Sequence, residues 1–220
     1  MTRFRILAVV CLPLLALGLV YALTGGMPEP SPNPPDTFSF AVLGDAPYYV
    51  WEEWQYRRVL ASMDSYDLSS VIHVGDIFWK PCSDERYQKA RRRLYGLRHP
   101  VIYTPGDNEW LDCWMEETGE YVPLERLNRV REIFFDEPRV SLGGERMPLD
   151  VQADDPDWAE FVENARWVHE RVVFATLHLV GDPSLQQVIP GGGPADVEDR
   201  ARRLEAATAW MMESCAGADS

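Results

Sequence analysis

Short apolar runs alternate with longer amphipathic segments along most of the chain. The runs are rich in β-branched and aromatic residues, and the segments between them carry apolar residues at helical spacing. Strand-like runs lie at residues 38–43, 71–74 and 101–103, and helical segments lie between them at 51–63 and 84–97. Alternating strands and helices are typical of βαβ units, which place neighbouring strands parallel in one sheet. The pattern therefore predicts an α/β domain with three neighbouring parallel strands.

The second half of the chain continues this alternation and ends on a helix. We expect a helix at 124–135, an acidic loop at 150–158, strands at 166–168 and 171–179, a Gly/Pro loop at 181–194 and a helix at 197–212. In an α/β sheet such a last helix normally leads into a further strand. Either the sheet is small, or the sequence is a fragment of a larger domain.

The first expected helix contains several large apolar side chains near helical spacing. They are Trp51, Trp54, Val59, Leu60 and Met63. Apolar residues that recur with this period form one face of an amphipathic helix, and that face normally packs on the core. We therefore predict that both tryptophans belong to the core.

The N-terminus has the pattern of an export segment. Arg3 and Arg5 precede 18 residues, 6–23, without a charge, and residues 25–37 then contain five prolines and two glycines. An apolar run of this length lies between a signal peptide, with about 7 to 15 apolar residues, and a membrane span, with about 20. We therefore expect a signal peptide or membrane anchor at 1–24, a Pro-rich linker at 25–37 and the folded domain at 38–220. The domain would be periplasmic, extracellular or membrane-anchored.

The charge of the chain restricts its partners. The formal net charge is -14, and hydrophobic residues make up 46% of the sequence. The apolar content is sufficient for a packed core, and such an acidic chain is not expected to bind nucleic acid. Contact with a membrane is expected only through the N-terminal segment, if that segment is not cleaved.

Four predicted strands end in a residue that can bind a metal. These residues are Asp45, Asp76, Asp107 and His178, and a glycine precedes each aspartate. Successive aspartates are 31 residues apart, the length of one βα unit. Because ligands gather at the carboxyl ends of strands in open α/β sheets, these side chains are expected to converge. The pattern predicts a shared site.

The residue types of this predicted site indicate which ions it would hold. Carboxylates together with an imidazole suit Mn, Fe or Zn, and one carboxylate can bridge two ions about 3.5 to 4 Å apart. Glu109, two residues after Asp107, is expected either to orient the third loop or to be a surface carboxylate. The other histidines, His73, His99 and His169, are expected to be structural.

These motifs resemble those of the calcineurin-like metallophosphoesterases. The family pattern is D-x-H, then G-D, then G-N-H-[DE], then a single His and a final G-H-x-H. The matching segments here are Asp45-Ala46-Pro47, Gly75-Asp76, Pro105-Gly106-Asp107-Asn108-Glu109 and His178. The resemblance implies a four-layer α/β/β/α sandwich, here incomplete at its C-terminus. It also implies that Asp45 holds a first divalent ion, that Asp76 bridges, and that Asp107 and His178 hold a second.

The sequence departs from the family pattern at three places. Pro47 stands where the family has a metal-binding histidine, so the first ion loses a ligand and one ion could be bound in place of two. Asn108 stands where the family has the histidine that assists the leaving group or the transition state. It is the candidate catalytic residue, although an amide cannot shuttle a proton at neutral pH. The final G-H-x-H is absent.

The resemblance implies a metal-dependent phosphoesterase that hydrolyses a phosphate mono- or diester outside the cytoplasm. The alternative is a phosphoesterase-fold binding protein with weak or no catalysis, because Pro47 and Asn108 remove chemistry. Cys82 and Cys113 follow the second and third loops, and in an oxidising compartment they could form a disulfide or remain free thiols. Cys215 is then left free, or is paired with a partner outside this chain.

Overall fold

The computed structural model describes residues 32–180 and 194–217. The predicted export segment, most of the predicted linker and nearly all of the predicted Gly/Pro loop lie outside the described residues. The chain divides into two units, Met1–Pro32 and Asn33–Ser220, and the description below concerns the second. Within the described ranges, no helix combines the length and the apolar character needed to cross a bilayer.

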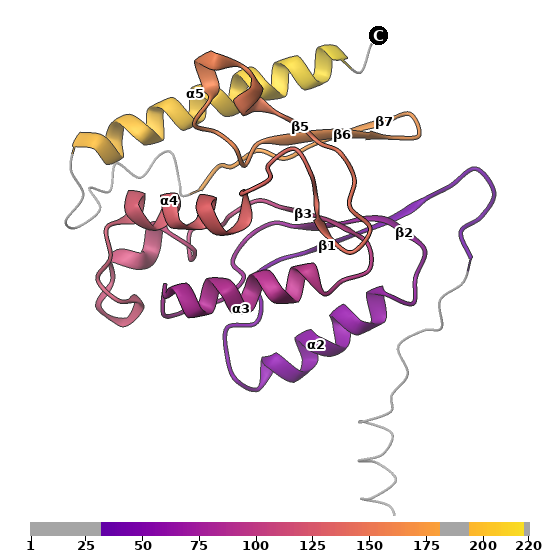
Figure 1. Cartoon of the computed structure of the whole chain (residues 1–220), viewed down its shortest axis with the longest axis horizontal. Helices are drawn as coiled ribbons and strands as arrows, with labels where there is room; N and C mark the ends of the chain where they lie inside the picture. Colours follow the sequence, from indigo (N-terminus) through magenta and orange to yellow (C-terminus); the bar gives the residue numbers. More distant parts are fainter. Residues whose placement is uncertain (1–31, 181–193, 218–220) are drawn as a thin grey trace, which may run out of the picture. The chain divides into compact units, whose positions relative to one another are not determined.

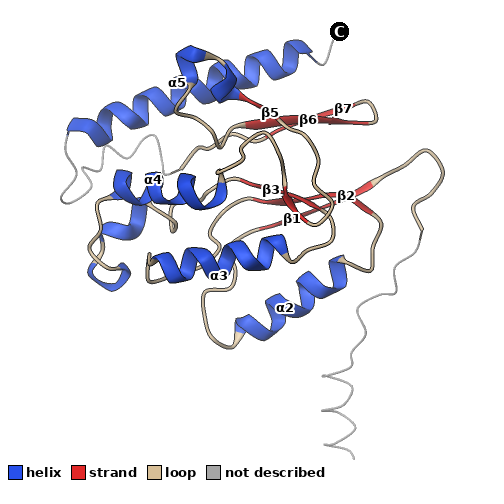
Figure 2. Ribbon diagram, in the orientation of Figure 1, coloured by secondary structure: helices blue, strands red, loops and turns tan. Residues whose placement is uncertain are grey.

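The first sheet has the strand order β1-β2-β3-β4, and its first three strands are labelled in Figure 2. Its strands are β1 (Ser39–Leu43), β2 (Leu68–His73), β3 (Pro100–Tyr103) and β4 (Leu142–Gly143). β1, β2 and β3 are parallel neighbours, which confirms the predicted arrangement, and β4 runs antiparallel to β3. β4 has only two residues, which is too short to produce a periodic signal in the sequence.

Three helices connect the strands of this sheet or follow them. They are α2 (Glu52–Met63), α3 (Asp84–Tyr95) and α4 (Pro123–Phe134). α3 begins where the Ser83 side chain accepts the backbone N–H of Arg86, and it carries acidic residues in its first turn and arginines in its last. Both features stabilise a helix, because they satisfy a free donor and oppose the helix dipole. Short 3-10 helices lie at Leu111–Trp114, Glu116–Thr118, Gln152–Asp154 and Pro156–Trp158.

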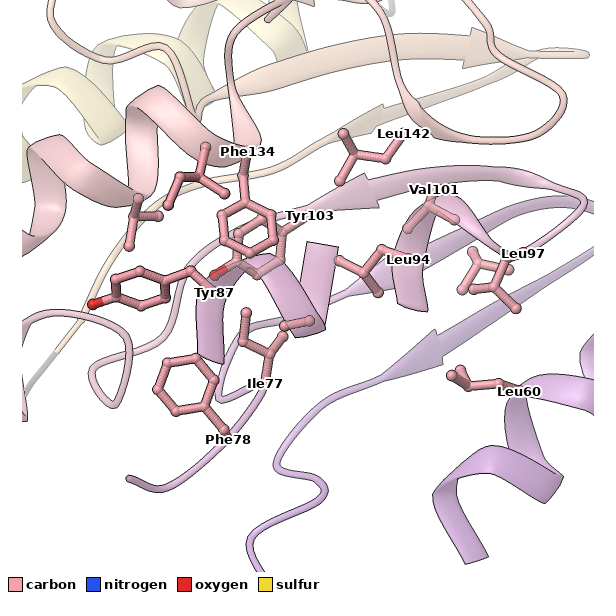
Figure 3. Close-up of a cluster of buried hydrophobic side chains, with 14 of the residues drawn as sticks. Leu60, Ile77, Phe78, Tyr87, Leu94, Leu97, Val101, Tyr103, Phe134 and Leu142 are labelled. Atoms are coloured by element: carbon pink, nitrogen blue, oxygen red, sulfur yellow. The ribbon is translucent and has the colours of Figure 1, made fainter. Parts of the chain in front are cut away.

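The core of this part lies between the helices and the sheet (Figure 3). Tyr87 and Leu94 of α3 are at most 1% exposed, and they pack with Val101 of β3, which is fully buried. Phe134 of α4 contacts the ring of Tyr103, with 4.8 Å between ring centroids. Burial of large apolar side chains on this scale is the main force that holds helices onto a sheet.

The predicted burial of the two tryptophans in α2 is wrong. Trp51 is 70% exposed and Trp54 is 51% exposed. The face of α2 that joins the core is set by Tyr56 and Leu60, which lie one turn apart and are 7% and 8% exposed. Trp54 therefore lies on another, more exposed face of α2, where the guanidinium of Arg58 covers its ring at 4.7 Å from the ring centroid. The spacing identified the helix correctly but not the face that is buried.

The second sheet is antiparallel and has the order β5-β6-β7. Its strands are β5 (Asp150–Val151), β6 (Ala165–His169) and β7 (Val172–Ala175), and the C-terminal helix is α5 (Pro194–Gly217) (Figure 1). β5 falls in the expected acidic loop, and β7 is shorter than the expected strand. Gln152 ties α5 to this sheet region, because its amide donates to the carbonyl of Ala206 at 2.7 Å.

Aromatic side chains connect the two sheets. The rings of Phe40 in β1 and Phe174 in β7 meet edge to face, with centroids 5.2 Å apart. Phe38 lies 6.2 Å from the same ring. Edge-to-face pairs at these distances add to the apolar burial between elements. The described residues thus form a mixed α/β fold with two sheets.

Candidate metal centre

The loops after β1, β2 and β3 are hydrogen-bonded to one another. The Asp45 N–H donates to the carbonyl of Gly75 at 3.3 Å, which joins the first loop to the second. The Asn108 N–H donates to Asp76 Oδ1 at 3.3 Å, which joins the second loop to the third. Three residues predicted for the site, Asp45, Asp76 and Asp107, therefore lie on loops held at one edge of the sheet.

The backbone at the first two aspartates has an unusual conformation. Asp45 has φ 56° and Asp76 has φ 55°, in the left-handed region that few residues other than glycine adopt. The adjoining glycines allow the loops to approach closely: a Cβ on Gly106 would lie 2.0 Å from Asp76 Oδ1, and Gly75 has φ 94°. Such strain is concentrated at functional sites, where the surrounding structure maintains it.

Tyr48 joins the first two aspartates, and the sequence did not indicate it. Its hydroxyl lies 2.9 Å from Asp76 Oδ2 and 3.2 Å from Asp45 Oδ1. The backbone N–H of Tyr48 donates to Glu52 Oε2 at 2.8 Å, so the first turn of α2 holds the loop in place. Burial and its hydrogen bond to Asp76 raise the pKa of Tyr48 well above its ordinary value. The phenol is therefore protonated at neutral pH.

The three aspartates form a concentration of negative charge. Burial and the charges of Asp107 and Asp45 together raise the pKa of Asp76 to about 6, although hydrogen bonds from Tyr48 and Asn108 act to lower it. Burial and the charge of Asp107 also raise the pKa of Asp112. No arginine or lysine of the described residues forms a salt bridge with Asp45, Asp76 or Asp107. A cation bound between them would relieve this repulsion.

Glu109 holds the second and third loops together through hydrogen bonds from their backbone N–H groups. Its side chain is fully buried, and its carboxyl oxygens accept the N–H groups of Asp76 at 3.1 Å, Ile77 at 2.5 Å and Gly106 at 2.8 Å. Burial raises its pKa to about 8. Of the two expectations for Glu109, orientation of the loop agrees with this geometry and a surface carboxylate does not.

A disulfide joins the segments that follow the second and third loops. Cys82 and Cys113 are bonded, with their Cα atoms 5.7 Å apart, and both residues are fully buried. This confirms the pairing that the sequence left open. Cys215, in α5, is a free and exposed cysteine, as expected from the pairing of the other two.

His178, the fourth predicted ligand, lies in a buried polar network. Its Nδ1 lies 2.7 Å from Glu163 Oε1, and its Nε2 accepts the indole N–H of Trp110 at 3.2 Å. With Nε2 as an acceptor, the neutral imidazole carries its proton on Nδ1 and donates it to Glu163. A carboxylate partner on the second nitrogen is common in metal-binding histidines. Here Trp110, and no aspartate of the three loops, contacts Nε2.

Glu163 is held ionised by two arginines. Burial lowers the pKa of His178, so the imidazole is neutral at neutral pH. Arg203 of α5 and Arg131 of α4 donate to Glu163 Oε1 at 2.8 and 2.9 Å. Although burial alone would raise the pKa of Glu163, its hydrogen bond from His178 and the charge of Arg131 hold it well below its usual range. This network fixes the position of His178.

Asn108 is buried, and the three other histidines pack against or hydrogen-bond other residues of the fold. Asn108, the candidate catalytic residue, is only 3% exposed. The Nε2 of His73 lies 3.1 Å from the hydroxyl of Tyr56, and its Nδ1 accepts the Gly75 N–H at 3.2 Å. His99 contacts the carbonyl of Met63 at 3.1 Å, and the ring of His169 lies 4.6 Å from that of Phe38. These packing partners agree with the structural role expected for the three histidines.

Comparison with known proteins gives no match: no protein-family model, no curated protein and no solved structure is similar to this chain. Among the described side chains, no three His, Cys, Asp or Glu residues form a ready group of metal ligands. The assignment of Asp45, Asp76, Asp107 and His178 as a ligand set therefore stays a prediction.

Proposed function

We propose that this chain is a metal-dependent phosphoesterase, which hydrolyses a phosphate mono- or diester outside the cytoplasm. One observation carries the proposal: three successive parallel strands bring aspartates to one edge of a sheet, on loops that hydrogen-bond to one another. Carboxylates at strand ends that have no positively charged partner are suited to bind cations. The Cys82–Cys113 disulfide supports a location in an oxidising compartment.

The proposed architecture is the four-layer α/β/β/α sandwich. Two features support it. The core joins α2, α3 and α4 to the first sheet, and α5 contacts the second sheet. The aromatic contacts of Phe38 and Phe40 with Phe174 bring the two sheets together. These pairings are those that a sandwich of two sheets covered by helices requires.

The residues present suit one or two divalent ions, Mn, Fe or Zn. The carboxylates of Asp45, Asp76 and Asp107 would hold them, with Asp76 shared between the two positions. His178 would join through Nε2 only if the bond from Trp110 were released. When bound, such ions polarise a phosphate ester and generate a nucleophile from water. Glu109 accepts backbone N–H groups of the loops that carry Asp76 and Asp107, and so fixes those two loops relative to each other.

A second candidate function is a binding protein on the same fold with little or no hydrolysis. The burial of Asn108, together with Pro47 at a position where the family has a ligand, favours it. A side chain that is 3% exposed has little surface for a leaving group to contact. The two candidates share the fold and differ in turnover.

The first test is the metal content of the purified, dialysed protein beside the Asp76→Ala variant. Asp154→Asn is the matched control, because Asp154 bonds Arg139 on the surface and is remote from the three loops in sequence. We expect one or two ions per chain in the parent and the control, and none in Asp76→Ala. A folded parent without bound metal, after incubation with Mn, Fe and Zn, would contradict the proposal.

Metal binding then permits a test of hydrolysis. We would assay the loaded protein on p-nitrophenyl phosphate and bis(p-nitrophenyl) phosphate. Turnover that disappears in Asp76→Ala and persists in Asp154→Asn would support the phosphoesterase. Metal binding without turnover on either class of ester would favour the binding protein.

A further inference from the structure

The hydroxyl of Tyr48 lies between two carboxylates of the proposed metal centre. It is 2.9 Å from Asp76 Oδ2 and 3.2 Å from Asp45 Oδ1. A phenol has one proton and can donate it to only one of these oxygens at a time. The other contact then joins two oxygen atoms without a hydrogen between them. One proton therefore serves two oxygen–oxygen contacts. A cation bound next to the three oxygens would stabilise the contact that lacks a proton.

The distances from the Tyr48 oxygen to the two carboxylate oxygens equal those between neighbouring ligands around one ion. Oxygen ligands at about 2.1 Å from an octahedral ion lie roughly 3 Å from their neighbours. The two distances to the Tyr48 hydroxyl, 2.9 and 3.2 Å, bracket this value. The phenol oxygen therefore already lies where a ligand shared with Asp45 and Asp76 would lie.

The position of Tyr48 is fixed by the surrounding structure. Glu52 Oε2 accepts the N–H of Tyr48 at 2.8 Å and that of Tyr49 at 3.2 Å. The ring of Tyr48 packs against Trp79, with 6.2 Å between centroids. Pro47, immediately before it, is buried. The hydroxyl is therefore held at the carboxylates from both its main chain and its ring.

We propose that the Tyr48 oxygen is a ligand of the ion held by Asp45 and Asp76, in place of the imidazole that Pro47 cannot supply. This inference rests on the proposed function, because it requires the metal centre. Pro47 has no donor atom, whereas the longer side chain of the next residue reaches the same two carboxylates. Tyr48 would thus supply the ligand that Pro47 cannot provide.

The test uses the full chain, freed of metal, and calorimetric titration with Mn²⁺. Tyr48→Phe removes the oxygen and retains the ring, and Tyr49→Phe is the matched control, because Tyr49 is 52% exposed and stacks on Trp51. We expect Tyr48→Phe to lose one ion or to bind it at least about 100-fold more weakly, because loss of an outer-shell partner alone costs about 10- to 100-fold. Tyr49→Phe should bind as the parent does.

A second readout follows the tyrosine itself. Coordination of the phenol oxygen should produce an ultraviolet difference spectrum of tyrosine as Mn²⁺ saturates the parent and Tyr49→Phe. Circular dichroism verifies that Tyr48→Phe is folded, and the spectrum of the parent alone remains informative if it is not. A parent whose tyrosine absorption does not change on saturation overturns the proposal, as does a folded Tyr48→Phe with the parent's stoichiometry and affinity.

Failure of this inference can be distinguished from failure of the proposed function. If the parent binds Mn²⁺ and Tyr48→Phe binds it equally well, the metal centre stands and Tyr48 is only a hydrogen-bonding neighbour. If the parent binds no Mn²⁺, Fe or Zn, the metal centre and the role of Tyr48 are both overturned. Each outcome therefore supports or excludes a specific claim.

Discussion

The carboxyl group of Glu109 accepts the backbone N–H of Asp76 at 3.1 Å, across a sequence separation of 33 residues. The same side chain accepts Ile77 N–H and, from its own loop, Gly106 N–H. One buried carboxyl group thus fixes the backbone of two loops that carry proposed ligands. The geometry of the site therefore depends on a residue that is not one of the proposed metal ligands.

Glu109→Gln should destabilise the protein and weaken its metal binding. Glutamine has one acceptor oxygen where the carboxyl group uses two, and its NH₂ would face a backbone N–H. A buried donor left without an acceptor costs about 1 to 3 kcal/mol, and we expect a loss of this size in urea unfolding. The exposed Glu117→Gln is the control. Equal stability of Glu109→Gln and the parent would show that these hydrogen bonds do not matter.

The metal-free protein should become less stable as the pH rises from about 4 to about 6 through the contribution of Asp76. Its pKa is raised to about 6 in the folded state, above a value near 3.8 in the unfolded chain. The folded state therefore binds more protons in this window, and stability falls as they dissociate. Asp76→Asn should lack this contribution. The measurement is the free energy of unfolding in urea of the parent and of Asp76→Asn across this window. The stability of Asp76→Asn relative to the parent should increase as the pH rises.

Local sequence patterns predicted much of the architecture. Gly-Asp pairs after apolar runs placed Asp45, Asp76 and Asp107 at the ends of parallel strands, because a strand, its terminal turn and the next helix are encoded within one βα unit. The pairing of Cys82 with Cys113 was among the alternatives for the same reason, since each cysteine follows one of these loops. The strand, turn and helix positions predicted within such units agree with the structure.

Features that depend on contacts between distant segments could not be predicted. Tyr48 is one tyrosine among nine, and its position between two carboxylates depends on a loop 28 residues further along. The exposure of Trp54 depends on which face of α2 packs on the sheet. His178 was identified by its place after a strand, but Arg203, which bonds the same Glu163 oxygen, lies on α5, 25 residues away. Helical or strand periodicity carries no information on such pairings.

Removal of the disulfide should cost the protein about 3 to 4 kcal/mol in stability. The bond closes a loop with a sequence separation of 31 residues, and constraint of the unfolded chain by a loop of this length is worth about that much. The Cys82→Ser/Cys113→Ser double variant should show this loss in urea unfolding. Cys215→Ser, at the free and exposed cysteine, should unfold like the parent. Equal stability of the double variant and the parent would mean that the bond is not formed in the protein.

Glu163→Gln should be strongly destabilising at neutral pH and should make stability less sensitive to acid. Glu163 is fully buried, and its removal leaves the guanidinium of Arg203, 3% exposed, without one of its carboxylate partners. Breaking a buried ion pair from one side costs about 3 to 5 kcal/mol. Because the folded pKa of Glu163 is lowered, its contribution is present above about pH 4.5 and is lost as the pH falls further. Urea unfolding at neutral and acid pH tests both expectations, with Glu160→Gln, which removes a surface bond to Arg202, as the control. If the two variants behave alike, the network around His178 does not stabilise the fold.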